Sequence, residues 1–294
     1  MLWGVGTEIV TLRSSDAWAG SVLSGNDLEL NVGEADWWTV HRGDSPVLAT
    51  AIHNGRGVPA NLAARMCLSA EGRLREEDPF TEFIIRDVPN RIVVHRSRFA
   101  VDLNRSADQA IYLRPEQSWG LRVWSEPPDS TMITEALRFH NGYYRMLETM
   151  LQSVEAQFGR FVVLDVHSYN HRRHGPEAPP AHPDTMPEIN IGTFSMDRRR
   201  WGYVLAPLIE RLGEIDVRGR RLTVRENVAF QGKGEQTRFI HEKFPETGCA
   251  IAIEFKKVFM DEWTGVPDRE ALTALRAVVR SVIPLLEDIM GGAG

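Results

Sequence analysis

The amino-acid sequence predicts an α/β layered fold, and three observations lead to this expectation. First, apolar runs of strand length recur along the chain, and the clearest is 161–166. Second, a long helix is expected just before it at 130–159, where apolar residues repeat at helical spacing: Leu137, Tyr144, Leu147 and Leu151. Third, this order of strand, long helix and strand is typical of layered α/β proteins.

The chain has the composition of an ordinary globular protein. It has 294 residues, of which 43% are hydrophobic and 25% charged, and its formal net charge is -6. No internal repeat or low-complexity linker divides it, so we expect a single domain over 1–294, with a β-rich N-terminal segment at 1–45. The negative charge argues against nucleic acid and anionic membranes as partners.

The cysteine content and the N-terminal residues indicate the cellular compartment. Two cysteines, Cys67 and Cys249, make neither a disulfide framework nor a four-cysteine zinc site. The first residues lack the basic and apolar regions of a signal peptide, and no apolar run reaches transmembrane length. We therefore expect a soluble, cytoplasmic protein, with its oligomeric state left open.

The expected elements alternate along the chain. Strands are expected at 46–52, 91–95, 161–166, 221–224 and 249–255, because these runs are short and apolar. Helices are expected at 130–159, 197–214, 237–243 and 267–290. Asp78, which precedes Pro79, suits a helix N-cap.

A long loop at 169–188 follows the strand at 161–166 and carries His171 and His174. Loops of this length without regular structure are often functional. We interpret the two histidines as mobile loop residues, some of which contact substrate, with metal ligation as the alternative.

Residues whose side chains can bind a metal or transfer a proton lie at the ends of three expected strands. His53 follows the strand at 46–52, His167 follows the strand at 161–166, and Glu254 lies in the strand at 249–255. Asp165 shares a face with His167, which suits a partner that orients a metal-ligating histidine. Sites in α/β sheets gather at the carboxyl ends of strands, and two histidines with a carboxylate are a minimal catalytic zinc set. For each histidine alone, a structural role is the alternative.

The segment 97–105 contains Arg98, Asp102, Asn104 and Arg105 within eight positions. Arginine binds carboxylates through two parallel hydrogen bonds, so this cluster indicates an anionic substrate. The alternative is a loop in which Asp102 neutralises an arginine.

Several stretches together resemble the N-formylglutamate amidohydrolase family, whose relatives are the zinc carboxypeptidases and aspartoacylases. The matching stretches, in the family's order, are 53–56, 75–82, 97–105, 164–168, 191–193, 227–238, and 253–254 with 259–262. The most diagnostic are Asp102-Leu103-Asn104-Arg105 and Asp165-Val166-His167-Ser168. The resemblance implies a three-layer α/β/α sandwich with a mixed central sheet, like that of zinc carboxypeptidases.

The resemblance also implies one zinc ion per chain, with His53 and His167 as ligands and a carboxylate as the third. In the carboxypeptidase branch that carboxylate stands three residues after the first histidine, a position that Arg56 occupies here. Asp78 or Glu77 is therefore the expected third ligand, with Glu76 left open.

Further roles follow from the same resemblance. Glu254 is expected to be the general acid and base of an amide hydrolysis. The residues expected to bind the substrate carboxylate or the developing oxyanion are Arg56, Arg98, Asn104, Arg105 and Arg238.

The expected substrate is the N-formyl or another N-acyl amide of an acidic amino acid or related carboxylate. Asn54 stands where the family more often has serine, and the loop after His167 is rich in histidine and arginine. One alternative is therefore a zinc carboxypeptidase or aminoacylase-like enzyme that acts on a peptide or another N-acyl substrate. A second alternative is a non-catalytic binding protein on the same fold.

Overall fold

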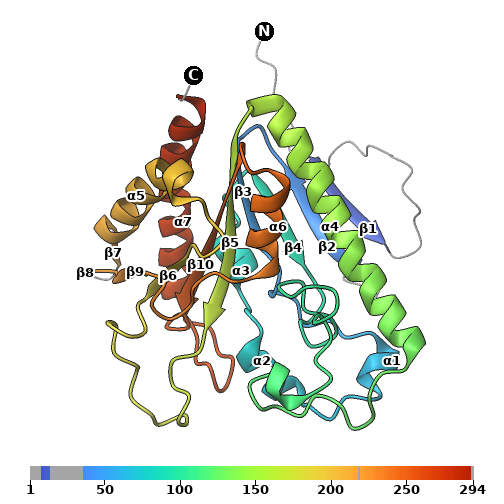
Figure 1. Ribbon diagram of the computed structural model, residues 1–294. Helices are drawn as coiled ribbons and strands as arrows, with labels where there is room; N and C mark the ends of the chain where they lie inside the picture. Colours follow the sequence, from blue (N-terminus) through green and yellow to red (C-terminus); the bar gives the residue numbers. More distant parts are fainter. Residues whose placement is uncertain (1–7, 14–35, 218, 293–294) are drawn as a thin grey trace.

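The computed structural model describes residues 8–13, 36–217 and 219–292, which form a three-layer α/β/α sandwich (Figure 1). In these residues eight strands make one mixed sheet in the order β1-β2-β4-β3-β5-β10-β6-β9. Their bounds are β1 Glu8–Arg13, β2 Asp36–Arg42, β3 Val47–Ala51, β4 Asn90–Val94, β5 Phe161–Tyr169, β6 Ile189–Gly192, β9 Val224–Glu226 and β10 Gly248–Lys256. A separate pair, β7 Asp216–Val217 and β8 Arg220–Arg221, forms a small ribbon. The expected layers and the mixed sheet are confirmed.

The four central strands run in one direction. β4 pairs parallel to β3, β3 parallel to β5, and β5 parallel to β10. β2 and β6 flank this group with antiparallel pairing. The carboxyl ends of the central strands therefore meet at one edge of the sheet, which is the edge where α/β proteins place their sites.

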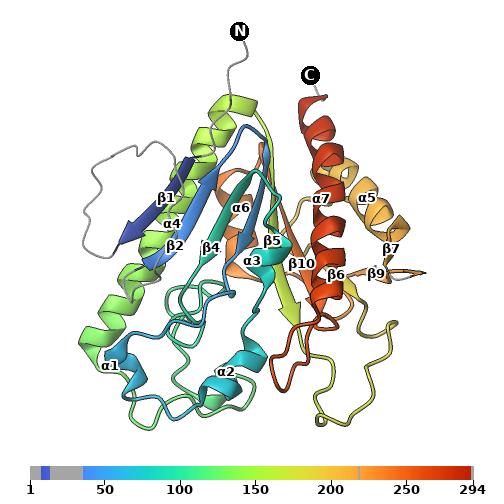
Figure 2. The same ribbon diagram turned by 180° about the vertical axis from the view of Figure 1, so that it is seen from behind.

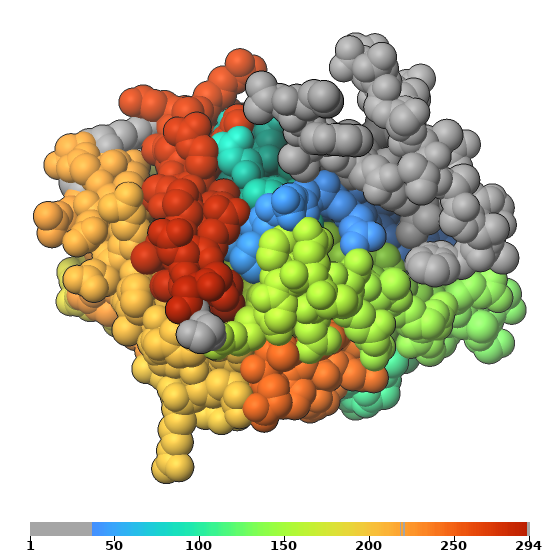
Figure 3. Space-filling model, turned by 90° about the horizontal axis from the view of Figure 1, so that it is seen from above, coloured from blue at the N-terminus to red at the C-terminus, as the bar shows by residue number. Residues whose placement is uncertain are grey.

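Helices cover both faces of the sheet. α4 (Ser130–Phe158) and α6 (Glu235–Lys243) cover one face, and α3 (Thr81–Ile84), α5 (Arg198–Glu214) and α7 (Arg269–Gly291) cover the other (Figure 2). Seen from above, α7 in red and α4 in yellow-green lie on opposite sides of the blue strands (Figure 3). β5 is buried over its whole length and alternates, with Val162 and Leu164 in the α5–α7 core and Val163 in the α4–α6 core.

Helix ends agree with the capping residues that the sequence offers. The side chains of Asp129, Asp197 and Asp268 accept hydrogen bonds from the first turns of α4, α5 and α7. Gly159, with φ of 76°, ends α4 in a conformation that a residue with a side chain rarely adopts.

Some elements differ from the expectation. Asp78 does not cap a helix, because its side chain is held by two histidines and α3 instead begins after Phe80. The expected strand 221–224 is divided between β8 and β9, and β6 follows the long loop as an additional strand. The short helices α1 (Ala60–Ala63) and α2 (Ala70–Glu76) and the 3-10 turn η1 (Pro115–Gln117) lie between β3 and α4.

The expected β-rich segment 1–45 contains β1 and β2, which add to one edge of the sheet. Residues 1–7 and 14–35 of this segment lie outside the described residues. Among the described helices, none combines the length and the apolar character needed to cross a membrane.

Candidate active site with a metal-type cluster

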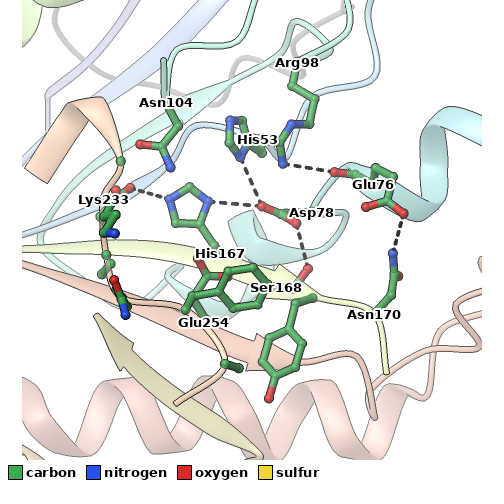
Figure 4. Close-up of a pocket in the computed structure, with 18 of the residues that line it drawn as sticks. His53, Glu76, Asp78, Arg98, Asn104, His167, Ser168, Asn170, Lys233 and Glu254 are labelled. Carbon is green, nitrogen blue, oxygen red and sulfur yellow. Dashed lines mark hydrogen bonds and ion pairs between the residues drawn. The ribbon is translucent and has the colours of Figure 1, made fainter. Parts of the chain in front are cut away.

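Three of the predicted side chains converge at the carboxyl edge of the central strands. His53 lies just after β3, while His167 and Glu254 lie near the ends of β5 and β10. His167 and Glu254 are register partners on these neighbouring parallel strands, so their side chains point to the same face of the sheet. All three line one pocket with a volume of about 460 Å³ (Figure 4).

A buried cluster of His53, Asp78 and His167 lies in this pocket. One nitrogen or oxygen atom from each residue lies within 4.8 Å of the other two. Asp78 Oδ2 is 3.3 Å from His53 Nδ1 and 3.2 Å from His167 Nδ1. Two imidazoles and a carboxylate form a donor set that suits a transition-metal ion such as zinc.

The far nitrogen of each histidine faces a second buried carboxylate. His53 Nε2 lies 2.7 Å from Asp102 Oδ1, and His167 Nε2 lies 3.1 Å from Asp165 Oδ1. Such partners set the orientation of a ligating histidine, and here they leave both Nδ1 atoms directed at Asp78. His53 Nδ1 is buried and has no hydrogen-bond partner among the described residues.

Asp102 is the centre of a hydrogen-bond network behind His53. Its Oδ2 accepts from Arg98 Nη2 at 2.8 Å and from the Tyr112 hydroxyl, and its Oδ1 accepts from the Asn104 backbone N–H at 2.8 Å. Burial alone would raise the pKa of Asp102, but the Arg98 guanidinium and His53 hold that pKa well below its usual range. Asp102 therefore stays ionised and fixes the His53 ring.

Asp165 has the corresponding position behind His167. Its Oδ1 accepts from Thr50 Oγ1 at 3.0 Å and from Gln236 Nε2 at 2.6 Å, so β3 and α6 both hold it. Burial would lower the pKa of His167, but Asp165 and Asp78 outweigh this and raise the pKa well above its usual value. This excess of buried negative charge favours a cation at the cluster.

Asp78 lies in the turn that follows α2, and this turn places its side chain next to the two histidines. The Asp78 backbone N–H donates to the His53 carbonyl at 2.9 Å, and Ser168 Oγ donates to Asp78 Oδ1 at 3.1 Å. The buried ammonium of Lys257, just after β10, donates to the carbonyls of Arg75 at 2.5 Å and Glu77 at 2.7 Å. Lys257 thus fixes the end of α2, a role that sequence reasoning did not assign.

The neighbouring acidic residues point elsewhere. Glu77 is fully buried, but its Oε1 accepts from Ser97 Oγ and its Oε2 lies 3.8 Å from Arg56 Nε. Glu76 Oε1 accepts from Asn170 Nδ2 at 3.0 Å at the side of the pocket (Figure 4). Of the three acidic residues considered from the sequence, the structure brings only Asp78 between the histidines.

Glu254 lines the pocket beside the cluster. Burial, followed by the nearby charges of Asp78 and Asp165, raises the pKa of Glu254 to about 7, although His167 acts in the opposite direction. A carboxyl group with a pKa near neutrality accepts and releases a proton readily at neutral pH, which suits general acid–base chemistry.

Three of the five residues expected to bind an anion line this pocket. Arg98 is half-buried and its guanidinium is held by Asp102, Tyr112 and a backbone carbonyl. Asn104 Oδ1 is buried without a partner in the described part of the chain. Arg105 is 43% exposed and lies 3.9 Å from Asp102, so its guanidinium is more open to a ligand.

The other two expected anion binders lie outside this pocket. Arg238 is on the exposed face of α6, where Glu235 and Glu242 pair with it because they stand three and four residues away on the helix. Arg56 lines a different cavity, and its guanidinium lies 3.8 Å from Glu77. Each of the two arginines is therefore engaged outside the pocket that holds the cluster.

Lys233 lines the pocket without having been predicted as a site residue. It stands between Gly232 and Gly234, two positions where a side chain would not fit. A Cβ at Gly232 would lie 2.5 Å from the backbone of Gly192, and one at Gly234 would lie 2.1 Å from Asn104 Oδ1. The sequence signal that would have found Lys233 is this glycine pair within a resembling stretch.

His171 lies near the pocket but is turned to another carboxylate. Its backbone N–H and that of Arg172 donate to the buried Glu262 carboxylate, both at 2.8 Å. The His171 ring lies 3.9 Å from the same carboxylate, and neither it nor His174 belongs to the described metal-type cluster. Glu262 therefore anchors the start of the long loop after β5.

A family model described as N-formylglutamate amidohydrolase matches residues 45–260 of this chain. The chain belongs to this family. N-formylglutamate amidohydrolases are hydrolases, so the pocket at the carboxyl edge of the sheet is the candidate active site of an amidohydrolase. No match was found among curated proteins.

Solved structures similar to this amidohydrolase support the fold. An N-formylglutamate amidohydrolase from Ralstonia eutropha JMP134 is 17% identical, with a TM-score of 0.66 over 85% of this chain and 98% of that one. A gene product from Agrobacterium tumefaciens is also 17% identical, with a TM-score of 0.57 over 88% and 95% of the two chains. At this level of identity the likeness concerns the fold alone.

Proposed function

We propose that this chain is a zinc-dependent amidohydrolase that cleaves the N-formyl, or another N-acyl, amide of an acidic amino acid or related carboxylate. The observation that carries the proposal is the convergence of His53, Asp78 and His167 next to Glu254 in a pocket with cationic side chains. Family membership supports amide hydrolysis, and the basic lining supports an anionic substrate.

The residues present fit a zinc ion. His53 Nδ1 is buried without a partner in the described residues, and it shares Asp78 Oδ2 with His167 Nδ1. Two nitrogens and one oxygen make the three-ligand set of catalytic zinc sites, which keep a fourth position for water or substrate. Asp102 and Asp165 supply the partners that ligating histidines commonly have.

In the proposed reaction each residue has a defined task. Zinc, when bound, polarises the amide carbonyl and lowers the pKa of its water to about 7. Glu254 accepts a proton from the attacking water, and the water oxygen bonds to the carbonyl carbon. Glu254 then donates that proton to the amide nitrogen as the C–N bond breaks, so the products are a carboxylic acid and a free amine.

Asn104, Arg105 and Lys233 line the pocket and are proposed to hold the substrate. Arg105 and Lys233 provide positive charge for its carboxylates, and the unpartnered Asn104 Oδ1 accepts a hydrogen bond from the substrate. The alternative substrates are peptides and other N-acyl amino acids. A release assay over N-formylglutamate, N-acetylated amino acids and small peptides distinguishes them, and full zinc loading without turnover of any member would support a binding protein instead.

Arg105→Gln is expected to raise KM for an acidic substrate by about 10-fold or more, because a charge-assisted hydrogen bond contributes roughly 1.5–3 kcal/mol. Arg238→Gln is the matched control, since this arginine is paired on the surface of α6. Steady-state kinetics of both variants provide the check. A larger effect in Arg238→Gln than in Arg105→Gln would contradict the proposed substrate position.

Asp102→Asn is expected to lower zinc affinity by about 10–100-fold, because partners of ligating histidines have effects of this size. The substitution keeps the side-chain shape but removes the charge that faces both His53 and Arg98. Competition with a zinc chelator measures the affinity, and Asp44→Asn, at a surface position, is the control. An Asp102→Asn protein with wild-type zinc affinity would show that Asp102 does not support the ligand His53.

A further inference from the structure

A second cavity, with a volume of about 740 Å³, is lined in part by residues that directly follow two members of the metal-type cluster in the chain. Asn54 and Arg56 line it just after His53 in the chain, and Pro79 and Phe80 line it just after Asp78. Part of its wall comes from β2 and β4, on the sheet face that points away from α4, and α3 with the turn after it supplies Glu82, Phe83 and Arg86. The mechanism proposed above uses none of its lining residues.

The charge in this second cavity is predominantly positive. Three arginines line it, Arg56, Arg86 and Arg91, against one acidic residue, Glu82. Glu82 is exposed and already accepts a hydrogen bond from Asn54 Nδ2 at 3.4 Å. This excess of positive charge stands out in a chain whose formal net charge is -6.

Arg91 is the most informative of these arginines. It is half-buried, and its guanidinium donates to the Val88 carbonyl at 3.2 Å and to His41 Nδ1 at 3.1 Å. Burial and the neighbouring Arg91 lower the pKa of His41 to about 4, so His41 is neutral and serves as an acceptor. Within the described residues no carboxylate lies at ion-pair distance from Arg91, although Glu82 and Asp87 act on its charge from further away. A partly buried charge such as that of Arg91 is unfavourable unless an anion compensates it, and the exposed Arg86 adds a second positive charge beside it.

The apolar part of the same cavity consists of Leu74, Phe80 and Phe83. Phe80 has a φ of 69°, a left-handed conformation that is unusual for a bulky residue. Strained residues of this kind are concentrated at functional sites, where the surrounding structure holds them in place. Here the strained residue turns the chain between Asp78 and α3 and lies on the cavity wall.

We propose that the second cavity is a binding site for a small organic oxyanion. Its anionic head, a carboxylate or a phosphate, is held by Arg86 and Arg91, since guanidinium groups bind both through paired hydrogen bonds. Its apolar body packs against Phe80 and Phe83. The volume accommodates such a molecule, and the site is independent of the proposed hydrolytic function.

The test uses calorimetric titration of the full chain with two probes, benzoate and phenyl phosphate, which share an aromatic body and differ in the oxyanion. Saturable binding of at least one probe is expected, and the tighter probe identifies the preferred head group. Arg86→Gln should weaken this binding by about 10-fold or more, because a hydrogen bond to a charged group is lost. Arg91→Gln should have at least the same effect, and thermal melting checks that each variant is folded.

Two matched variants separate this cavity from other basic surfaces. Arg199→Gln changes an exposed arginine on α5, and Arg105→Gln changes the first pocket. Arg199→Gln should leave all probe binding unchanged. Arg105→Gln should affect only probe bound in the first pocket, so the binding that is weakened in Arg86→Gln should be retained. The proposal is overturned if neither probe binds saturably, if binding is unchanged in Arg86→Gln, or if Arg105→Gln weakens binding while Arg86→Gln does not.

Discussion

Replacing Glu254 with glutamine should lower kcat by about 10²–10⁴-fold while zinc content stays at the wild-type level. The substitution preserves the size of the side chain but removes the group that accepts and returns the proton. Glu254 lies beside His167 on the neighbouring strand but is not part of the described metal-type cluster, so the ion should remain bound. Turnover and zinc content are measured on the same preparation.

Glu76→Gln is the control for this experiment, because Glu76 also lines the pocket but faces Asn170. It should retain most of the wild-type turnover. If Glu254→Gln keeps full activity, Glu254 is not the general acid and base. If the variant loses zinc together with activity, Glu254 is a metal ligand and not the general acid and base.

Asp78→Asn should abolish both zinc binding and turnover. Asp78 Oδ2 is the oxygen that lies between the two Nδ1 atoms of His53 and His167, and an amide oxygen lacks the charge that holds a divalent cation. The loss of affinity should exceed the roughly 100-fold upper range for partners that only orient a ligand. Zinc affinity is measured by competition with a chelator.

Glu77→Gln is the matched variant, one residue earlier in the chain. Its carboxylate is held by Ser97 and lies near Arg56, so zinc affinity should stay at the wild-type level. This pair of variants decides between the two carboxylates that the sequence left open. The reverse result, with zinc lost in Glu77→Gln and kept in Asp78→Asn, would contradict the arrangement described here.

The sequence predicts the central strands and long helices well, because their patterns are local. The helix expected at 130–159 corresponds to α4 at Ser130–Phe158, and the strand expected at 249–255 corresponds to β10 at Gly248–Lys256. The polar residues at their ends could also be found, since parallel strands bring their carboxyl ends to one edge. His53, His167 and Glu254 meet in one pocket for this reason.

Long-range contacts explain what the sequence could not decide. Adjacent Glu77 and Asp78 are equivalent as residue types, and only the turn held by Lys257 and the His53 carbonyl points Asp78 to the histidines. Asp102 was open to two interpretations, and in the fold it pairs with Arg98 and contacts His53. Arg238 was expected to bind an anion because it lies in a stretch that resembles the family. A sequence motif does not show which way a side chain points from its helix, and in the fold Arg238 pairs with Glu235 and Glu242.

An anomalous difference map, measured at the zinc absorption edge from crystals of the zinc-loaded protein, tests the proposed zinc site directly. We expect one strong peak per chain, within bonding distance of His53 Nδ1, Asp78 Oδ2 and His167 Nδ1, at about 2.0–2.2 Å from each. A peak at any other set of residues, or no peak in the presence of stoichiometric zinc, would contradict it.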